Sequence, residues 1–175
     1  EGAEVWVSPA NNPKRKLKYT WELIKVGKSL VGINTSLSNK IAQESIETGV
    51  VAELQGYDTL RSEVKYGKNS RIDLLLENPF KPACYVEIKN VTLRWDRSAE
   101  FPDSVTARGT KHLAELANQV AAGDRAVMYY LTQREDCDTF TVAKDIDPEY
   151  ATALEKAMWV KLKRGERPCK NSKVT

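Results

Sequence analysis

Hydrophobic and polar residues alternate through residues 61–93. Two segments interrupt this alternation: a breaker at Gly67-Lys68-Asn69 and a proline-bounded loop centred on Phe80. Alternation with a period of two, interrupted by turn residues, predicts three short strands joined as a β-meander. Closing the second hairpin about Phe80 sets three pairs of residues opposite each other: Ile72 with Ile88, Leu74 with Val86, and Asp73 with Glu87. The pattern therefore predicts two carboxylates that face each other across adjacent strands.

The segments around this meander predict a mixed α/β domain. Strand patterns cover residues 3–8 and 21–35, the second interrupted by a turn at Gly27-Lys28. Helices are predicted over residues 39–46, from a cap near Ser104 or Thr106 to a stop at Gly123, and over residues 149–158. The apolar run 125–132 predicts a central strand beside the meander. We expect a mixed central sheet flanked by helices.

The facing carboxylates of Asp73 and Glu87 suggest a cation site. Like charges directly opposite on adjacent strands destabilise a sheet unless a positive group lies between them, and hard cations such as Mg²⁺ take carboxylate oxygens. Lys89 shares the face of Glu87 by the period of two. The alternative is a solvated strand face, on which an acid and a base two residues apart are common. Asp73 favours the first interpretation, because an acid within the apolar run Ile72 to Leu76 is costly unless it is paired.

The spacing of Ser-Arg-Ile-Asp, a proline-containing turn and Tyr-Val-Glu-Ile-Lys-Asn-Val-Thr-Leu resembles the PD-(D/E)XK nuclease superfamily. Four further runs resemble the sugar fermentation stimulation protein A family: Asn-Pro-Lys-Arg-Lys-Leu from Asn12, Tyr-Thr-Trp-Glu-Leu from Tyr19, Gly-Ile-Asn-Thr from Gly32, and Phe-Pro-Asp-Ser-Val-Thr from Phe101. The resemblance covers residues 3–156 and implies a bacterial or archaeal protein.

This resemblance implies a metal-dependent nuclease that hydrolyses phosphodiester bonds in DNA or RNA. Asp73 and Glu87 would hold Mg²⁺ or Mn²⁺ with Glu63 as a further ligand, and Lys89 would orient the attacking water. The superfamily often places a Lys or Gln on the later helix, which makes Lys111 a further catalytic candidate; for His112 we expect a packing or surface role. The alternative is a non-catalytic DNA-binding regulatory protein, linked to sugar (maltose) metabolism, that retains the nuclease fold.

The family resemblance also implies that residues 1–36 are the remnant of an OB-fold-like β domain, which precedes a nuclease domain over residues 37–158. Such barrels bind nucleic acid on a strand face that carries aromatic and basic residues. The candidate nucleic-acid-binding residues are the basic run and a nearby aromatic side chain: Lys14, Arg15, Lys16, Lys18 and Trp21. A solvated basic loop is the alternative for this run.

Composition and charge change this picture in only a few respects. The formal charge of +3 is uneven, because residues 156–175 carry seven basic side chains and one acidic one. We predict a basic, disordered tail over residues 159–175. Three widely spaced cysteines and a single histidine argue against a disulfide framework and a zinc cluster.

No apolar run of membrane-spanning length and no signal pattern occur, so we expect a cytoplasmic protein with nucleic-acid partners and no membrane partner. A second copy of the chain is a further candidate partner, in a homodimer.

Overall fold

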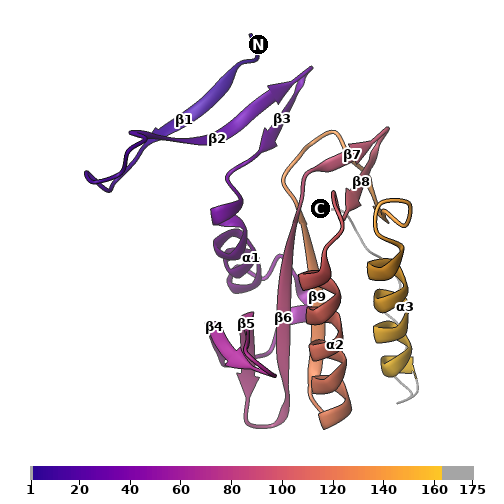
Figure 1. The fold of residues 1–175 in the computed structure, drawn as a ribbon. Coiled ribbons are helices and arrows are strands. Elements are labelled where there is room, and N and C mark those ends of the chain that lie inside the picture. The colour runs from indigo at the N-terminus through magenta and orange to yellow at the C-terminus, as the bar shows by residue number, and fades with distance from the viewer. Residues whose placement is uncertain (1, 163–175) are drawn as a thin grey trace.

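The computed structural model describes residues 2–162, and a four-stranded mixed sheet forms its centre (Figure 1). The strands are ordered β4-β5-β6-β9, with bounds Thr59–Tyr66, Ser70–Asn78, Lys81–Val91 and Arg125–Thr132. The first three pair antiparallel, which confirms the predicted meander, and β9 pairs in parallel with β6. The strand predicted to be central therefore lies at the sheet edge. The reason is long-range pairing, because the next strand along the chain joins another sheet.

Both hairpins of the meander close as their turn residues predict. In the first, Tyr66 pairs with Ser70, which leaves a three-residue loop in which Asn69 takes a positive φ of 62°. In the second, Asn78 pairs with Lys81, and Phe80 at the tip is 93% exposed. The first turn sets the register of β4 and β5, whereas a register shift between Leu76 and Asn78 separates the second turn from the ladder that pairs Leu74 with Val86.

The predicted pairing of Leu74 with Val86 is confirmed, but the regular ladder between β5 and β6 ends at this pair. Beyond it, the alternation of faces breaks: Leu74 packs in the cluster that includes Ala42 and Ile46, whereas Ile72 packs with Leu116 on the other face. The neighbouring strand shows the same break at Glu63, which has a φ of 55° and no partner in the ladder with β5. The predicted pairs of Ile72 with Ile88 and of Asp73 with Glu87 are therefore absent from the ladder.

Helices cover both faces of this sheet (Figure 1). On one face, α1 (Ser38–Glu47) contributes Ala42 and Ile46 to a core with the even-numbered residues of β6. On the other face lies α2 (Ala107–Ala122), which contributes Leu116. Its N-cap is Thr106, whose hydroxyl accepts a hydrogen bond from Gly109 N, and its C-cap is Gly123 with a φ of 113°. Both ends match the prediction.

Two short 3₁₀ turns and a third helix complete the helical layers. The turns are η1 (Thr35–Leu37) before α1 and η2 (Ala52–Leu54) after it. Helix α3 (Pro148–Leu162) packs against α2, and its buried Tyr150 meets Tyr130 of β9 with 2.6 Å between the two hydroxyl oxygens. The helix extends four residues past its predicted end at Met158, and the remainder of the predicted basic tail, 163–175, lies outside the described residues.

The N-terminal segment forms a separate three-stranded antiparallel sheet, as predicted (Figure 1). Its strands are β1 (Val5–Pro9), β2 (Tyr19–Val26) and β3 (Ser29–Gly32), and Gly27 takes a φ of 62° in the last turn. A bridge between Val31 and Arg134, with a 2.7 Å hydrogen bond from Gly32 N to Gln133 O, ties this sheet to the segment after β9. The sheet is thereby fixed to the central domain.

A third sheet extends the C-terminal end of β6. It contains β7 (Leu93–Trp95), β8 (Ser98–Phe101) and β10 (Thr139–Val142), with β8 in the middle. Asp136 binds both Arg94 and Arg134, which holds the β7–β8 hairpin to the segment that enters β10. In the described part of the chain, no helix is long and apolar enough to cross a membrane.

Asp147 joins the beginnings of α2 and α3, and this predicts a pH-dependent contribution to stability. Its buried carboxylate accepts hydrogen bonds from Thr106 N at 2.8 Å and Tyr150 N at 2.9 Å, and these donors hold the Asp147 pKa below its ordinary value. A lowered folded-state pKa stabilises the fold above the unfolded pKa of about 4, and the contribution is lost as pH falls through the folded value.

We therefore expect Asp147→Asn to lower the melting midpoint by several degrees at pH 7, and by much less near pH 3. Thermal unfolding of parent and variant at both pH values measures this difference. Asp145→Asn is the matched control, since Asp145 is exposed and lies on the same segment. A difference between parent and Asp147→Asn that stays constant with pH would contradict the prediction.

Candidate active site

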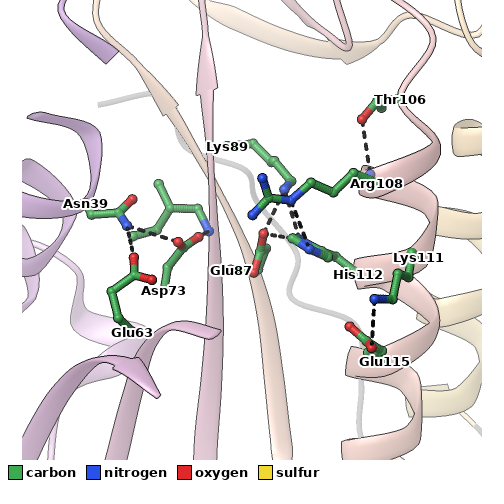
Figure 2. A network of polar contacts seen from close by, with 12 residues as sticks. Asn39, Glu63, Asp73, Glu87, Lys89, Thr106, Arg108, Lys111, His112 and Glu115 are labelled. Atoms are coloured by element: carbon green, nitrogen blue, oxygen red, sulfur yellow. Dashed lines mark hydrogen bonds and ion pairs between the residues drawn. The ribbon is translucent and has the colours of Figure 1, made fainter. Parts of the chain in front are cut away.

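The predicted site residues lie in two groups, one on either side of β6 (Figure 2). Asp73 lies with Asn39 and Glu63 on the side of α1, whereas Glu87 lies with Lys89 on the side of α2. The predicted face-to-face carboxylates are thus replaced by two carboxylates that flank one strand. The cause is the break in alternation at Glu63 and Asp73, which turns Asp73 away from the face that it would occupy in a regular strand.

Asp73 is held by donors from two other elements. Ile88 N of β6 donates to Asp73 Oδ2 at 2.7 Å, so the carboxylate takes a backbone donor at the point where the ladder has ended. Asn39 Nδ2 of α1 donates to Asp73 Oδ1 at 3.0 Å and to Glu63 Oε1 at 3.3 Å. The amide therefore bridges the two acids. Glu63 does lie beside Asp73, as the three-residue first hairpin predicts.

The pKa of Asp73 is raised above its ordinary value. Burial is the main cause and the negative charge of Glu87 is the second, while the hydrogen bonds from Ile88 and Asn39 and the charge of Lys89 oppose the shift. The negative charge of Glu87 thus acts on Asp73, although the two carboxylates do not face each other across the strands. A cation bound by either carboxylate would offset this repulsion.

Glu87 is the most deeply buried acid of the site, with only 3% of its side chain exposed. Lys89 Nζ donates to Glu87 Oε1 at 2.8 Å, and His112 Nδ1 of α2 contacts the same oxygen. Burial alone would raise the Glu87 pKa, but the hydrogen bond from His112 and the charge of Lys89 hold it below its ordinary value. Glu87 Oε2 is buried and has no hydrogen-bond partner among the described residues.

The contacts of His112 identify its protonated nitrogen. Glu87 can only accept through its ionised carboxylate, so His112 Nδ1 carries the proton in that contact. On the other side of the ring, Arg108 Nε lies 3.4 Å from His112 Nε2, which accepts. His112 is thus held between a carboxylate and a guanidinium, with Lys89 Nζ 3.4 Å from Nδ1.

Lys111 lies away from this group. It is 51% exposed, and its ammonium lies 3.3 Å from Lys68 O and 3.7 Å from Glu115 Oε1 (Figure 2). The neighbouring His112 reaches Glu87 instead, although a packing or surface role was predicted for it. Helix geometry explains the exchange: successive residues point about 100° apart, and His112, four residues before Leu116, shares the buried stripe. That spacing was the signal that could have identified His112.

Asn39 is the other residue of the candidate site that was not predicted, because its sequence position indicates only the start of the helix predicted over residues 39–46. The structure places Asn39 in the first turn of α1, three residues before the buried Ala42, so it points at the sheet. Arg108 was not singled out at all. It lies four residues before His112, and an i, i+4 pair shares one side of a helix.

The carboxylates fit a hard divalent cation such as Mg²⁺ or Mn²⁺. A buried carboxylate oxygen without a donor, as at Glu87 Oε2, is unfavourable unless a ligand supplies its missing partner. No three His, Cys, Asp or Glu side chains within residues 2–162 gather as a ready metal cage. A site on Asp73 and Glu87 would therefore depend on water and substrate phosphate for its other ligands, which suits Mg²⁺.

The predicted nucleic-acid-binding residues lie on the N-terminal sheet and in the loop between β1 and β2. Arg15 and Trp21 line one open cavity of about 830 Å³ with Tyr19, and Trp21 is 50% exposed. Arg15 Nη1 donates to Thr20 Oγ1 at 2.6 Å, and Lys18 Nζ donates to Pro13 O at 3.2 Å. The structure thus brings Arg15 and Trp21 together, while the other predicted basic residues, Lys14, Lys16 and Lys18, are exposed on the same loop.

Two family models match this chain in tandem. Residues 1–33 match the SfsA N-terminal OB domain, and residues 36–163 match the sugar fermentation stimulation protein RE domain. The chain belongs to the sugar fermentation stimulation protein family. The resemblance seen in the sequence is thereby confirmed, and the N-terminal sheet is part of an OB domain.

Relatives of known sequence and structure agree with this membership. Sugar fermentation stimulation protein homologs from Paramagnetospirillum magneticum and Maricaulis maris are 62% and 58% identical to this chain over 156 residues, which cover 89% and 87% of the chain. The solved structure of Pyrococcus furiosus SfsA in complex with Ca²⁺ is 27% identical, with a TM-score of 0.80 over 89% of this chain. The chain spans 66% of the length of each of these three proteins. The predicted mixed α/β nuclease-like fold is confirmed.

Proposed function

We propose that this protein is a nucleic-acid-binding, metal-dependent nuclease that hydrolyses phosphodiester bonds. The observation that carries the proposal is Glu87, a buried carboxylate whose Oε2 lacks a partner and whose Oε1 is held by Lys89 and His112. Asp73 supplies a second carboxylate near enough to be affected by its charge. Glu87 Oε2 is available to a cation, whereas the similarly unpartnered oxygens of Glu115 lie by the Lys111 ammonium, which is 3.7 Å from Glu115 Oε1.

In the proposed reaction, Asp73 and Glu87 would hold Mg²⁺ or Mn²⁺, and such a cation would supply Lewis-acid chemistry that polarises the phosphate and lowers the pKa of a water molecule. Lys89 orients the attacking water and offsets the negative charge that develops on the phosphate. His112 fixes the orientation of the Glu87 carboxylate through Nδ1. Asn39 and Ile88 N fix Asp73 in the same way. The chain thus supplies two oriented carboxylates and one ammonium group.

The relatives support the choice of cation. The Pyrococcus furiosus protein was solved in complex with Ca²⁺, a hard cation that takes oxygen ligands as Mg²⁺ does. Because Ca²⁺ has a looser coordination geometry than Mg²⁺, it is the natural non-catalytic probe of the same carboxylates. We propose that the corresponding site here is the one at Asp73 and Glu87.

Cleavage of labelled single- and double-stranded DNA and RNA tests the proposal. Each substrate is incubated with Mg²⁺, Mn²⁺, Ca²⁺ or a chelator, and the Glu87→Gln variant serves as the control for a contaminating nuclease. We expect cleavage with Mg²⁺ or Mn²⁺, none with chelator and none by the variant. Cleavage that persists with chelator, or an equal rate for the variant, would refute the assignment.

A second candidate is a non-catalytic nucleic-acid-binding protein that retains the fold. It is favoured by the contacts of Asp73, both of whose oxygens have hydrogen-bond donors without any metal. If this candidate is right, the protein binds oligonucleotides with an affinity that is insensitive to chelator and cleaves none of the four substrates.

Under both candidates, the loop between β1 and β2 contributes electrostatic affinity for nucleic acid. We expect simultaneous replacement of Lys14, Arg15, Lys16 and Lys18 by Ala to weaken binding and to flatten its salt dependence. The log–log slope should fall by up to about 3–4, since each of the four phosphate contacts would contribute about 0.7–0.9. Fluorescence anisotropy across a salt series measures this slope.

The control for this loop is a charge elsewhere on the same sheet. Lys28→Ala removes an exposed positive charge from the opposite end of β2 and should change the slope far less than Lys16→Ala does. An unchanged slope in the fourfold variant would exclude this loop as a nucleic-acid contact.

A further inference from the structure

The guanidinium of Arg108 projects toward the site without an acidic partner. Four other arginines of residues 2–162 form ion pairs with carboxylates: Arg61 with Glu77, Arg94 and Arg134 with Asp136, and Arg97 with Asp138. No carboxylate of the described residues lies within ion-pair distance of Arg108, which is exposed. Its polar contact in the described structure is the one from Nε to His112 Nε2.

The geometry of this contact aims Arg108 at the site. Figure 2 shows the side chain reaching from the first turn of α2 toward Glu87, Lys89 and His112. Because Nε is directed at His112, the two terminal nitrogens form the free edge of the guanidinium plane. His112 in turn is held by Glu87, so the position of the guanidinium is coupled to that of the proposed metal-binding carboxylate.

With a divalent cation bound, the local charge balance would call for an anion. Lys89 and Arg108 each carry a positive charge, which Glu87 and Asp73 balance in the absence of a cation. Arg108 also lies in the first turn of a 16-residue helix, and the N-terminus of a helix carries partial positive charge. A divalent cation bound to Glu87 would therefore leave an excess of positive charge. A phosphodiester is the anion that nucleic acid brings to such a site.

We propose that Arg108 binds the non-bridging oxygens of the phosphodiester group positioned at Glu87 and Lys89. The inference rests on the proposed nucleic-acid function and assigns its phosphate contact. A planar guanidinium donates two parallel hydrogen bonds to a phosphate, which an ammonium cannot match. Arg108 is therefore a substrate-binding residue, and it is distinct from the basic loop between β1 and β2.

The first test is equilibrium binding of a short labelled single-stranded oligonucleotide in chelator, so that neither metal binding nor cleavage contributes. Arg108→Ala should lower the affinity about 10-fold, and Arg108→Lys should recover only part of the loss. Arg71→Ala is the matched control, since Arg71 on β5 is also exposed and has no carboxylate partner among the described residues. It should stay within about twofold of the parent.

The second test is chemical rescue. Added methylguanidinium should restore part of the binding of Arg108→Ala, whereas methylammonium at the same concentration and ionic strength should not. A merely structural role for Arg108 predicts no such difference between the two cations. Equal affinities for Arg108→Ala and Arg71→Ala, or equal effects of the two cations, would overturn the inference.

These outcomes separate this inference from the nuclease proposal. If the parent cleaves nucleic acid but Arg108→Ala binds and cleaves like Arg71→Ala, the phosphate assignment fails and the nuclease assignment stands. If Arg108→Ala loses affinity and is rescued by methylguanidinium while the parent cleaves no substrate, Arg108 binds phosphate in a protein that is not a nuclease.

Discussion

Glu87→Gln is expected to abolish metal-dependent cleavage and to weaken Mg²⁺ binding strongly. The substitution removes the charge of the acid whose Oε2 is buried without a partner. It preserves the size of the side chain and leaves an amide oxygen that can still accept from Lys89 or His112. Since metal polarisation contributes several kcal/mol to charge stabilisation, the cleavage rate should fall by about 10³-fold or more. Asp73→Asn should produce a comparable loss, because it removes the second carboxylate.

Isothermal titration calorimetry with Mg²⁺ and single-turnover cleavage measure these two effects separately. Glu77→Gln is the matched control, since Glu77 lies on the same strand as Asp73 but forms an ion pair with Arg61. It should retain both metal binding and cleavage. If Glu87→Gln and Asp73→Asn bind Mg²⁺ like this control, the two acids are structural and the metal assignment is wrong.

The meander was predictable from the sequence because its strands and turns are specified by residues that are close together in the chain. Alternation and turn residues define β4, β5 and β6, and the three-residue loop at Gly67 sets the first register. The break at Glu63 and Asp73 was not predictable in this way. The break requires a positive φ at Glu63, and glutamate is not a residue type that favours positive φ. A prediction based on a period of two also assumes that the strand contains no such break.

The site residues on the helices could be predicted from the sequence only in part. The cap at Thr106 and the stop at Gly123 fix the limits of α2, and the buried stripe through Leu113 and Leu116 fixes its phase. That phase turns His112 inward and Lys111 outward, so the choice between them needed no structure. By contrast, the contact of Asn39 with Asp73 joins residues 34 apart in the chain. The edge position of β9 likewise depends on which sheet β10 joins.

Lys89 differs from the two acids beside it, and its replacement should separate chemistry from metal binding. Its ammonium lies 2.8 Å from Glu87 Oε1, and its side chain is 15% exposed. Lys89→Met retains most of the apolar stem and removes the charge. Because a neighbouring positive charge is lost, Glu87 should bind Mg²⁺ as well as before or more tightly. If Lys89 orients the water and offsets developing charge, cleavage should nevertheless fall by about 10²-fold or more.

Loss of a buried partner also predicts a cost to the fold of about 1–3 kcal/mol, moderated because His112 continues to hold the same oxygen. Thermal unfolding therefore accompanies the calorimetry, and cleavage is compared at a temperature at which parent and variant are both folded. Lys65→Met, which removes an exposed lysine from β4, is the control for loss of charge alone. Slow cleavage with intact Mg²⁺ binding would distinguish Lys89 from Asp73 and Glu87, whose variants lose both. If Lys89→Met cleaves like Lys65→Met, the ammonium serves only to neutralise Glu87, and the water must be oriented by another group.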